Sequence, residues 1–467
     1  MSLVEFLQEL VIKDWKFWNE NNRLRYSTPQ EESTSSVLEQ LKQHKSEILQ
    51  LLQEQPDIFN VYSLSYGQQA LWFLWQLTPE SHAYNISLPL HICSEVDVTA
   101  IEKALQLLIK RHPLLRTTFS KRGHEPIQQV HQNQKLDFLK IDASTWHKDE
   151  LKEKVIEAHQ MIFDIEKGSI MRVRCFTSSK KEHILLITIH HIACDRLSLG
   201  TLIQELIQVY QSQQAGTEIN LHPIKHSYQD YINWEKRVLA GTQGEKLWSY
   251  WQKQLAGNLP TLNIATDRQR LSIQTYNGAS HKFKLSSELI DRVKEQAKSL
   301  GVTFYTILLA VFEVLLYRYT GQEDILVGSP TFGRSQLEFV RIVGYFVNPV
   351  ALRANLSNNP SFEEFLVQIR QTVLEALTHQ EYPFPLIVQN LQPNRDPSCS
   401  PIFQVSFSLQ QFQQSQNALF MLDNQSEASA DFGEIKLRIF DIPQQEGQFD
   451  LALEIIENNL STSGIFK

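Results

Sequence analysis

The chain has 467 residues, of which 42% are hydrophobic and 21% are charged. These proportions are typical of a globular protein and exclude a wholly disordered or collagen-like chain, and a usual domain size of about 150 residues predicts roughly three domains. The net charge of -8 argues against nucleic acid as the main partner, because phosphate binding needs a basic face.

The first 53 residues predict a small separate unit. Apolar residues recur at helical spacing in the FLQEL segment, and two short stretches flank residues 19–22, NENN, which is a hairpin pattern. The later LKQHKSEILQLL segment predicts one or two amphipathic helices. Residues 54–62 contain Pro56 and are predicted to be a linker.

This segment resembles the tubulysin-synthetase-type docking domains found at the N-termini of assembly-line subunits. The resemblance implies an αββαα fold over residues 1–53 and a partner at the C-terminal end of an upstream synthetase or polyketide synthase. Arg23 and Arg25 on the predicted second strand, with Lys42 and Lys45 nearby, favour an acidic partner segment. The alternative is a helical extension packed on the main body, with these charges merely solvated.

After residue 60 the pattern becomes mixed α and β. Residues 97–113 predict a helix with Asp97 as its N-cap and Pro113 at its end. Residues 183–189, HILLITI, predict a buried strand, which an amphipathic helix follows. Residues 303–321 predict a long apolar helix with a glycine just past its end, and residues 324–330 predict a strand.

The sequence predicts neither a transmembrane helix nor a signal peptide. Its apolar runs are shorter than the roughly 18 residues of a membrane span, so no membrane partner is predicted. Glu5 and Glu9 interrupt the N-terminal apolar stretch, which therefore does not resemble a signal peptide. The four cysteines have no paired or CxxC spacing, which predicts a reduced, cytoplasmic protein without a structural zinc site.

Two adjacent histidines stand between the buried strand and the helix that follows it. Side chains alternate along a strand, so His190 and His191 should face opposite sides and only one can serve a given reaction centre. A histidine beside the N–H groups of a helix start could assist the attack of an amine on an acyl carbonyl. Asp195 could fix the turn or orient the ring. On position alone, a structural role for both histidines is the simpler interpretation.

Seven segments in a fixed order give these histidines a context. They are SYGQQALWFL (65–74), RHPLLRTTF (111–119), HHIACDR (190–196), YQDYINW (228–234), VGYFVNPVALR (343–353), HQEYPFP (379–385) and RDPSCSP (395–401). Over residues 60–467 this order resembles the condensation domains of nonribosomal peptide synthetases. The resemblance implies an α+β fold of two chloramphenicol-acetyltransferase-like lobes, 63–235 and 236–467, that form a V-shaped pseudodimer with a tunnel between them.

The resemblance also implies roles for individual residues. His191 faces the tunnel and positions or deprotonates the attacking amine, and His190 is its structural neighbour within the same catalytic motif. Asp195 is structural and pairs with an arginine, for which Arg270 and Arg268 are the candidates. The residues expected to line the tunnel are Arg196, Ser198, Tyr345 and Asn348. Arg116 is a further candidate for a structural ion pair.

The implied reaction is peptide-bond formation. A donor acyl group arrives as a thioester on an upstream carrier protein, and an aminoacyl acceptor arrives on a downstream carrier. Both hang on phosphopantetheine arms, so the domain itself needs no metal or bound cofactor. The donor can be a peptidyl, polyketide or fatty acyl chain. Condensation domains typically continue beyond the point where this chain ends, so we expect an N-terminal fragment of a larger synthetase.

One position departs from the family motif HHxxxDG. Arg196 stands where the family has glycine, and an arginine held in a left-handed conformation would cost roughly 1–2 kcal/mol. A long cation could also narrow the tunnel or contact a substrate. The alternative function is therefore a catalytically impaired scaffold that recruits carrier or tailoring proteins. His191, Asp195 and Asn348 match the family motifs, so the sequence favours an active enzyme.

Overall fold

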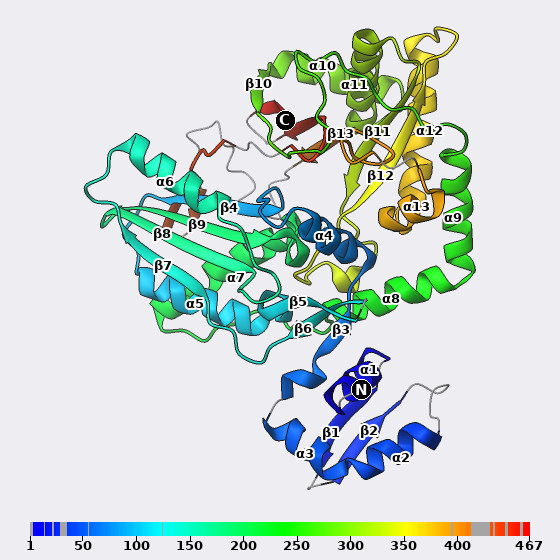
Figure 1. The fold of residues 1–467 in the computed structure, drawn as a ribbon. Helices are drawn as coiled ribbons and strands as arrows, with labels where there is room; N and C mark the ends of the chain where they lie inside the picture. Colours follow the sequence, from blue (N-terminus) through cyan, green and yellow to red (C-terminus); the bar gives the residue numbers. More distant parts are fainter. Residues whose placement is uncertain are drawn as a thin grey trace.

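The computed structural model describes most of the chain. The described residues are 3–13, 15–20, 23–28, 35–54, 56–123, 125–393, 396–411, 430–432, 435–443, 447–457 and 461–467. They form a small N-terminal unit and two larger lobes, each built on its own sheet (Figure 1).

The N-terminal unit has the predicted αββαα order. Its elements are α1 (Leu3–Ile12), β1 (Lys16–Glu20), β2 (Arg23–Ser27), α2 (Ser35–Gln43) and α3 (Lys45–Glu54). The two strands form an antiparallel hairpin, and the helices bury Leu7, Leu10, Leu41 and Ile48 in a core of their own. Because this core is separate from those of the lobes, the unit has the anatomy of an independent small domain.

Residues 54–62, predicted to be a linker, carry secondary structure in their described part. This stretch contains the 3₁₀ helix η1 (Pro56–Phe59) and the start of strand β3 (Val61–Ser63). Ile58 and Val61 are buried, and β3 pairs with β6 of the first lobe. Pro56 therefore begins a short structured connection to the first lobe.

The first lobe is built on a six-stranded sheet. In spatial order its strands are β14 (Ala430–Phe432), β15 (Ile435–Ile439), β4 (Asn85–Ile92), β9 (Glu182–His190), β8 (Met171–Ser179) and β7 (Asp137–Asp142). A second sheet of three strands contains β3, β6 (Glu125–Val130) and β5 (Thr117–Arg122). β9 lies between β4 and β8 and is buried at every position except its first, as its continuous apolar run predicts.

Helices cover both faces of the six-stranded sheet. α5 (Val98–Arg111) and α7 (Arg196–Ala215) share one core with β8 and β9, whereas α6 (Lys148–Gln160) packs on the opposite face. The predicted N-cap of α5 is confirmed, because the Asp97 carboxylate accepts from the N–H groups of Thr99 and Ala100. The remaining helices of this lobe are α4 (Tyr66–Leu77) and the 3₁₀ helices η2 (Pro113–Arg116) and η3 (His191–Ala193).

The second lobe repeats the plan of one sheet with helices. Its strands lie in the order β10 (His281–Leu285), β17 (Thr462–Phe466), β16 (Leu451–Glu457), β13 (Val405–Gln411), β11 (Asp324–Thr331) and β12 (Asn348–Asn355). Its helices are α9 (Thr242–Gln254), α10 (Ser287–Ser299), α11 (Phe304–Thr320), η4 (Leu337–Phe339), α12 (Phe362–Thr378) and α13 (Phe384–Leu391). Gly321, at a φ of 68°, ends α11 as predicted.

Length and hydropathy decide whether a helix among the described residues could span a membrane. No single helix there is long and apolar enough to cross a bilayer. α10 and α11 pass the length and composition test only as a pair, and they are bent by 105° at their junction.

The two lobes are not separated at the predicted residue. The boundary between 235 and 236 falls inside α8 (Tyr228–Ala240), whose first half is buried in the first core and whose last turn packs against the second. In addition, β14 and β15 come late in the sequence, but they extend the first lobe's sheet, because β15 pairs with β4 and β14 pairs with β15. The chain thus crosses between the lobes more than once (Figure 1).

Candidate active site

His191 lies where the first lobe meets the segment that follows β11. β9 ends at His190, and His191 begins the turn η3 that leads into α7. Its backbone N–H donates to the carbonyl of Tyr84, and its Nδ1 lies 2.8 Å from the carbonyl oxygen of Cys194. A carbonyl only accepts, so Nδ1 carries the proton and the lone pair of the neutral ring resides on Nε2. Burial lowers the pKa of His191, which favours this neutral form.

The ring of Tyr345 lies edge-on against His191, with ring centroids 4.9 Å apart. The main chain of Tyr345 is held in turn, because the hydroxyl of Tyr228 donates to its carbonyl and also contacts Ser65. Gln68 of the same opening motif donates to the carbonyl of Ile192 in the turn after His191. Motifs far apart in sequence thus meet around one histidine.

His190 points the other way, as the strand alternation predicts. It is buried, and its Nδ1 accepts from the N–H of Ile192 at 3.2 Å. Its ring lies edge-on to Phe163, and the guanidinium of Arg172 lies 4.4 Å from the centroid of the Phe163 ring. Burial lowers the pKa of His190 to about 3, so it is a neutral packing residue.

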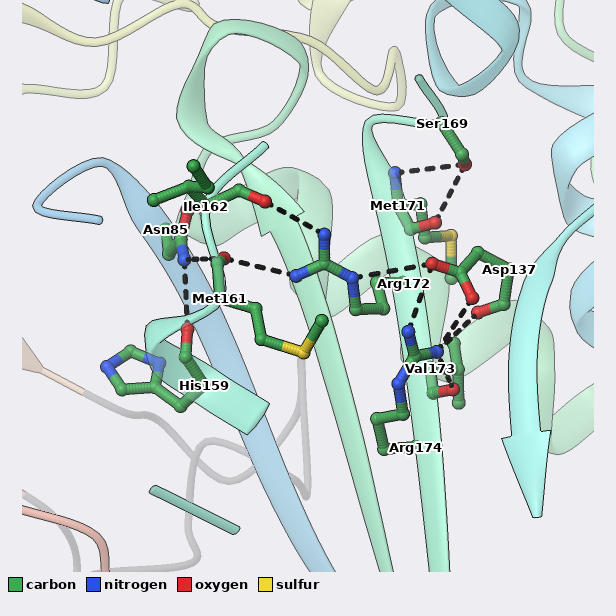
Figure 2. Close-up of polar contacts among 10 residues, drawn as sticks. All are labelled: Asn85, Asp137, His159, Met161, Ile162, Ser169, Met171, Arg172, Val173 and Arg174. Atoms are coloured by element: carbon green, nitrogen blue, oxygen red, sulfur yellow. Dashed lines mark hydrogen bonds and ion pairs between the residues drawn. The ribbon is translucent and has the colours of Figure 1, made fainter. Parts of the chain in front are cut away.

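The support for His190 extends into a polar cluster on β8 (Figure 2). Arg172 donates to the carbonyls of Met161 and Ile162, at 3.1 and 3.0 Å, and this holds the segment that carries Phe163. Arg172 and Arg174 also share the carboxylate of Asp137, whose pKa these two arginines lower although burial opposes them. This cluster therefore fixes the segment behind His190 and does not contact His191 in the bonds drawn.

Asp195 forms the main polar link across the site, and its predicted partner is corrected. Its Oδ2 lies 2.6 Å from Nη1 of Arg334 and its Oδ1 lies 3.0 Å from Nη2, with both side chains no more than 3% exposed. Asp195 also caps α7 by accepting from the N–H of Ser198, and it accepts from the N–H of Phe346. The partner is thus neither Arg270 nor Arg268.

Arg334 follows β11 and was not identified from the sequence. The only signal is the Gly333-Arg334 pair a few residues after a predicted strand. Gly333 has a φ of 61°, and a Cβ there would meet the carbonyl oxygen of Phe346, so glycine is needed for the close approach that delivers Arg334. Ser198, predicted as tunnel lining, instead accepts from Arg334 and bonds the main chain of Gly344.

The three arginines predicted to form ion pairs lie elsewhere. Arg270 pairs with Asp450, with Nη1 2.9 Å from Oδ1, and donates to the carbonyl of Ser398. It lies beside the last motif and not beside Asp195. Arg268 contributes its carbonyl to a bond from Thr266, and Arg116 donates to the carbonyl of His131.

Asn348 anchors a loop. Its amide nitrogen donates to the carbonyls of Gln380 and Tyr382, and its oxygen accepts from the N–H of Phe384. Two motifs, VGYFVNPVALR and HQEYPFP, are therefore joined by one side chain. Asn348 also borders a cavity between the lobes, together with Tyr345 and a residue that the sequence did not single out, Glu235.

Glu235 is a buried carboxyl group close to the site. It accepts from the N–H of Tyr66 at 3.1 Å and from the hydroxyl of Tyr231 at 3.4 Å. Burial raises its pKa to about 7, so it exchanges its proton near neutral pH. It directly follows the YQDYINW motif, and nothing in its sequence position distinguishes it from a surface glutamate.

Arg196 reaches from the first lobe to the second. It is the first residue of α7, and its backbone is helical rather than left-handed. The strain expected for an arginine in a left-handed conformation is therefore absent at this described position. Its side chain is 48% exposed, and Nη1 lies 3.5 Å from Oε1 of Glu454 on β16. Lys467 holds the same carboxylate at 2.8 Å. The arginine therefore spans the lobe junction near the turn at His191.

The basic residues predicted for docking lie on the N-terminal unit. Arg23 and Arg25 are exposed on β2, and Arg25 forms an ion pair with Glu20 across the hairpin at 2.6 Å. Lys42 lies in the last turn of α2, and Lys45 begins α3. The structure thus places them on one small domain, while their role in docking stays a prediction.

The fold and the turn at His191 define a class: two α/β lobes of the chloramphenicol acetyltransferase type, with an HHxxxD turn at their junction. Residues 58–465 match the family model described as the condensation domain, and residues 3–54 match the TubC N-terminal docking domain. The chain therefore belongs to the condensation-domain family of nonribosomal peptide synthetases and carries an N-terminal docking domain. The predicted α+β fold and its resemblance to this family are confirmed.

The chain spans only a small part of the curated relatives that it matches. It is 36% identical to one subunit of the linear gramicidin synthase of Brevibacillus parabrevis over 84% of the chain, but it spans only 5% of that protein. It is 29% identical to bacitracin synthase 2 of Bacillus licheniformis over 97% of the chain and 17% of that protein. A crystallised four-domain nonribosomal peptide synthetase superposes with a TM-score of 0.78 at 21% identity, covering 87% of this chain and 31% of that one. That last likeness concerns the fold alone.

Proposed function

We propose that this condensation domain forms an amide bond between two carrier-bound substrates. The donor is an acyl or peptidyl thioester on an upstream carrier, and the acceptor is an aminoacyl thioester on a downstream carrier. The observation that supports this most is His191, a partly buried neutral imidazole whose Nδ1 proton is donated to the carbonyl of Cys194 and whose Nε2 holds the lone pair. Such a group suits the acceptance of a proton from an amine.

In the proposed reaction, the acceptor nitrogen attacks the donor carbonyl while Nε2 of His191 orients that nitrogen or takes its proton. A C–N bond forms and the C–S bond breaks, and the phosphopantetheine thiol of the upstream carrier leaves with a proton. Much of the rate should come from holding two tethered substrates together, which can contribute several kcal/mol. No metal or cofactor bound by the domain takes part in this proposal.

Asp195 and Arg334 serve as positioning residues in this mechanism. Their bidentate ion pair fixes the start of α7, which follows the His191 turn by only a few residues. Charge-assisted bidentate pairs restrict geometry as well as adding energy. The pair therefore holds the His191 turn against the segment that follows β11.

The docking domain extends the proposal to partners. A TubC-type N-terminal unit on a condensation domain supports delivery of the donor by another polypeptide, a synthetase or a polyketide synthase. The second candidate, a scaffold without condensing activity, is favoured by one observation only, which is Arg196 at the position of the motif glycine.

A reconstitution tests the proposal. An upstream carrier loaded with an acyl group and a downstream carrier loaded with an amino acid are mixed with the chain, and the downstream carrier is examined by intact-protein mass spectrometry. The proposal expects the acyl group to appear on the downstream carrier only when the chain is present. Lack of product with every loaded pair, from a folded chain, would favour the scaffold.

A further inference from the structure

A group of three potential metal-ligating side chains lies far from His191 on the first lobe's sheet. His91 and Cys93 come from the end of β4 and the residue after it, and Glu182 begins β9. β4 and β9 are antiparallel, with Asn85 opposite His190 and Ile92 opposite His183. The group is therefore at the other end of these strands from the candidate active site.

The strand geometry brings these three side chains to one face. His91 and Cys93 flank Ile92 in sequence, so both point away from the core face that Ile92 occupies. Glu182 precedes His183, the cross-strand partner of Ile92, and therefore points to the same face as Cys93. One nitrogen, one sulfur and one oxygen atom, from the three side chains, all lie within 4.8 Å of one another.

The ligand set suits one kind of ion. Imidazole nitrogen, thiolate sulfur and carboxylate oxygen are the donors that Zn²⁺ accepts, and three protein ligands leave a fourth position for water. Cys93 is a free, partly exposed cysteine, and Glu182 is exposed, so an ion could reach the group from solvent. The Glu182 carboxylate already contacts Nε2 of His91, which shows that two of the donors converge on one point.

We propose that His91, Cys93 and Glu182 bind a zinc ion at this end of the sheet. This replaces the expectation from cysteine spacing that the chain has no zinc site. That expectation considered only ligands close together in sequence, whereas β-pairing adds Glu182 from another strand. The site is independent of the proposed condensation reaction.

The position suggests what the ion stabilises. The N–H of Cys93 donates to the carbonyl of Lys436 at 2.8 Å, and His91 lies opposite Arg438 in the register. Both partners belong to β15, the late strand that crosses back to complete the first lobe's sheet. An ion bound there would therefore hold the end of β4, which is the strand that pairs with β15. Burial and the charge of Glu182 raise the pKa of the Cys93 thiol, an effect that Arg438 and a bound cation both oppose.

Zinc binding by the whole reduced chain tests this site. Equilibrium dialysis followed by elemental mass spectrometry should find one zinc ion per chain. Cys93→Ser and Glu182→Gln should each weaken binding by at least about tenfold. Cys399→Ser is the matched control, because Cys399 is also a free and partly exposed cysteine, and it should leave binding unchanged. Zinc should raise the melting temperature of the unaltered chain and of Cys399→Ser, but not that of Cys93→Ser.

Cobalt substitution gives a readout that does not depend on how well a variant folds. Co²⁺ added to the unaltered chain should produce a thiolate-to-metal charge-transfer band, and Cys399→Ser should keep it. Zinc binding that is equal in the unaltered chain and Cys93→Ser, or a cobalt complex without that band, would overturn the proposal. His91 and Glu182 would then form an ordinary ion pair beside an inert thiol.

Discussion

At the scale of single residues, the two adjacent histidines receive opposite environments from one strand end. His190 is enclosed by Phe163 and the backbone of Ile192, whereas His191 meets Tyr345 at the lobe junction. The alternation of side chains along β9 predicted this division. It did not predict which nitrogen of His191 carries the proton, because the carbonyl of Cys194 that fixes it lies in an irregular turn.

The first prediction is that His190→Ala lowers the stability of the first lobe. The change removes a packed ring and the acceptor for the Ile192 N–H, for which a loss of about 2–4 kcal/mol is expected. Urea unfolding measures it. Condensation per folded molecule should fall much less than stability does. A stable His190→Ala chain with selectively lost turnover would show that the two histidines have been assigned the wrong faces.

The second prediction concerns acid. The folded-state pKa of His190 is about 3, well below the ordinary 6.5, because burial disfavours the charged ring. The unfolded state therefore binds more protons between these values, and stability is retained above pH 6.5 and falls as the pH drops toward 3. Urea midpoints measured across this window should decline, and the decline should be smaller in His190→Gln. Equal declines in the two proteins would contradict burial of the His190 ring as the cause.

The third prediction concerns Arg196. Because the backbone of Arg196 is already helical, glycine would relieve no backbone strain there. The half-exposed contact of Arg196 with Glu454 contributes about 1 kcal/mol or less to stability. Arg196→Gly should therefore change the condensation rate by less than about tenfold, with Arg196→Ala as the control for helix propensity. Kinetics with loaded carriers measure both. A wild-type chain without activity that glycine restores would support the scaffold instead.

At the scale of elements, the start of α7 is joined to the loop after β11 by Asp195 and Arg334. The fourth prediction is that Arg334→Ala destabilises the chain by about 3–5 kcal/mol, because it leaves a buried carboxylate without its cation. Arg270→Ala is the matched control. Its ion pair is partly exposed, and its loss should cost about 1 kcal/mol or less. Denaturant unfolding compares the two. A similar, small effect of both changes would contradict the structural role of Arg334.

Elements with strong local signals could be predicted from the sequence. Helix α5 begins after Asp97 and ends before Pro113 as expected, and α11 ends at Gly321. Long-range relations could not be predicted. The pairing of β15 with β4, the Asp195–Arg334 pair and the continuity of α8 across the predicted boundary depend on contacts between distant segments, which leave no periodic trace in the sequence.

At the scale of the whole molecule, the docking domain has a core of its own and a hairpin with exposed basic residues. The fifth prediction is that deletion of residues 1–53 abolishes transfer from the upstream protein but spares reaction with donor carrier supplied at high concentration. Binding to an acidic C-terminal segment should also weaken with salt, because exposed charges are screened. Calorimetry and the transfer assay measure these effects. Equal loss of both reactions would mean that the unit is structural.

The central claim is that His191 serves amide-bond formation at the junction of the lobes. Single-turnover transfer between two loaded carriers, followed by mass spectrometry of the downstream carrier, tests it most directly when the wild-type chain is compared with His191→Ala. We expect the wild-type chain to form the acyl-aminoacyl thioester and the folded variant to do so about 10²–10⁴ times more slowly. A folded His191→Ala chain that condenses at the wild-type rate would contradict the mechanism.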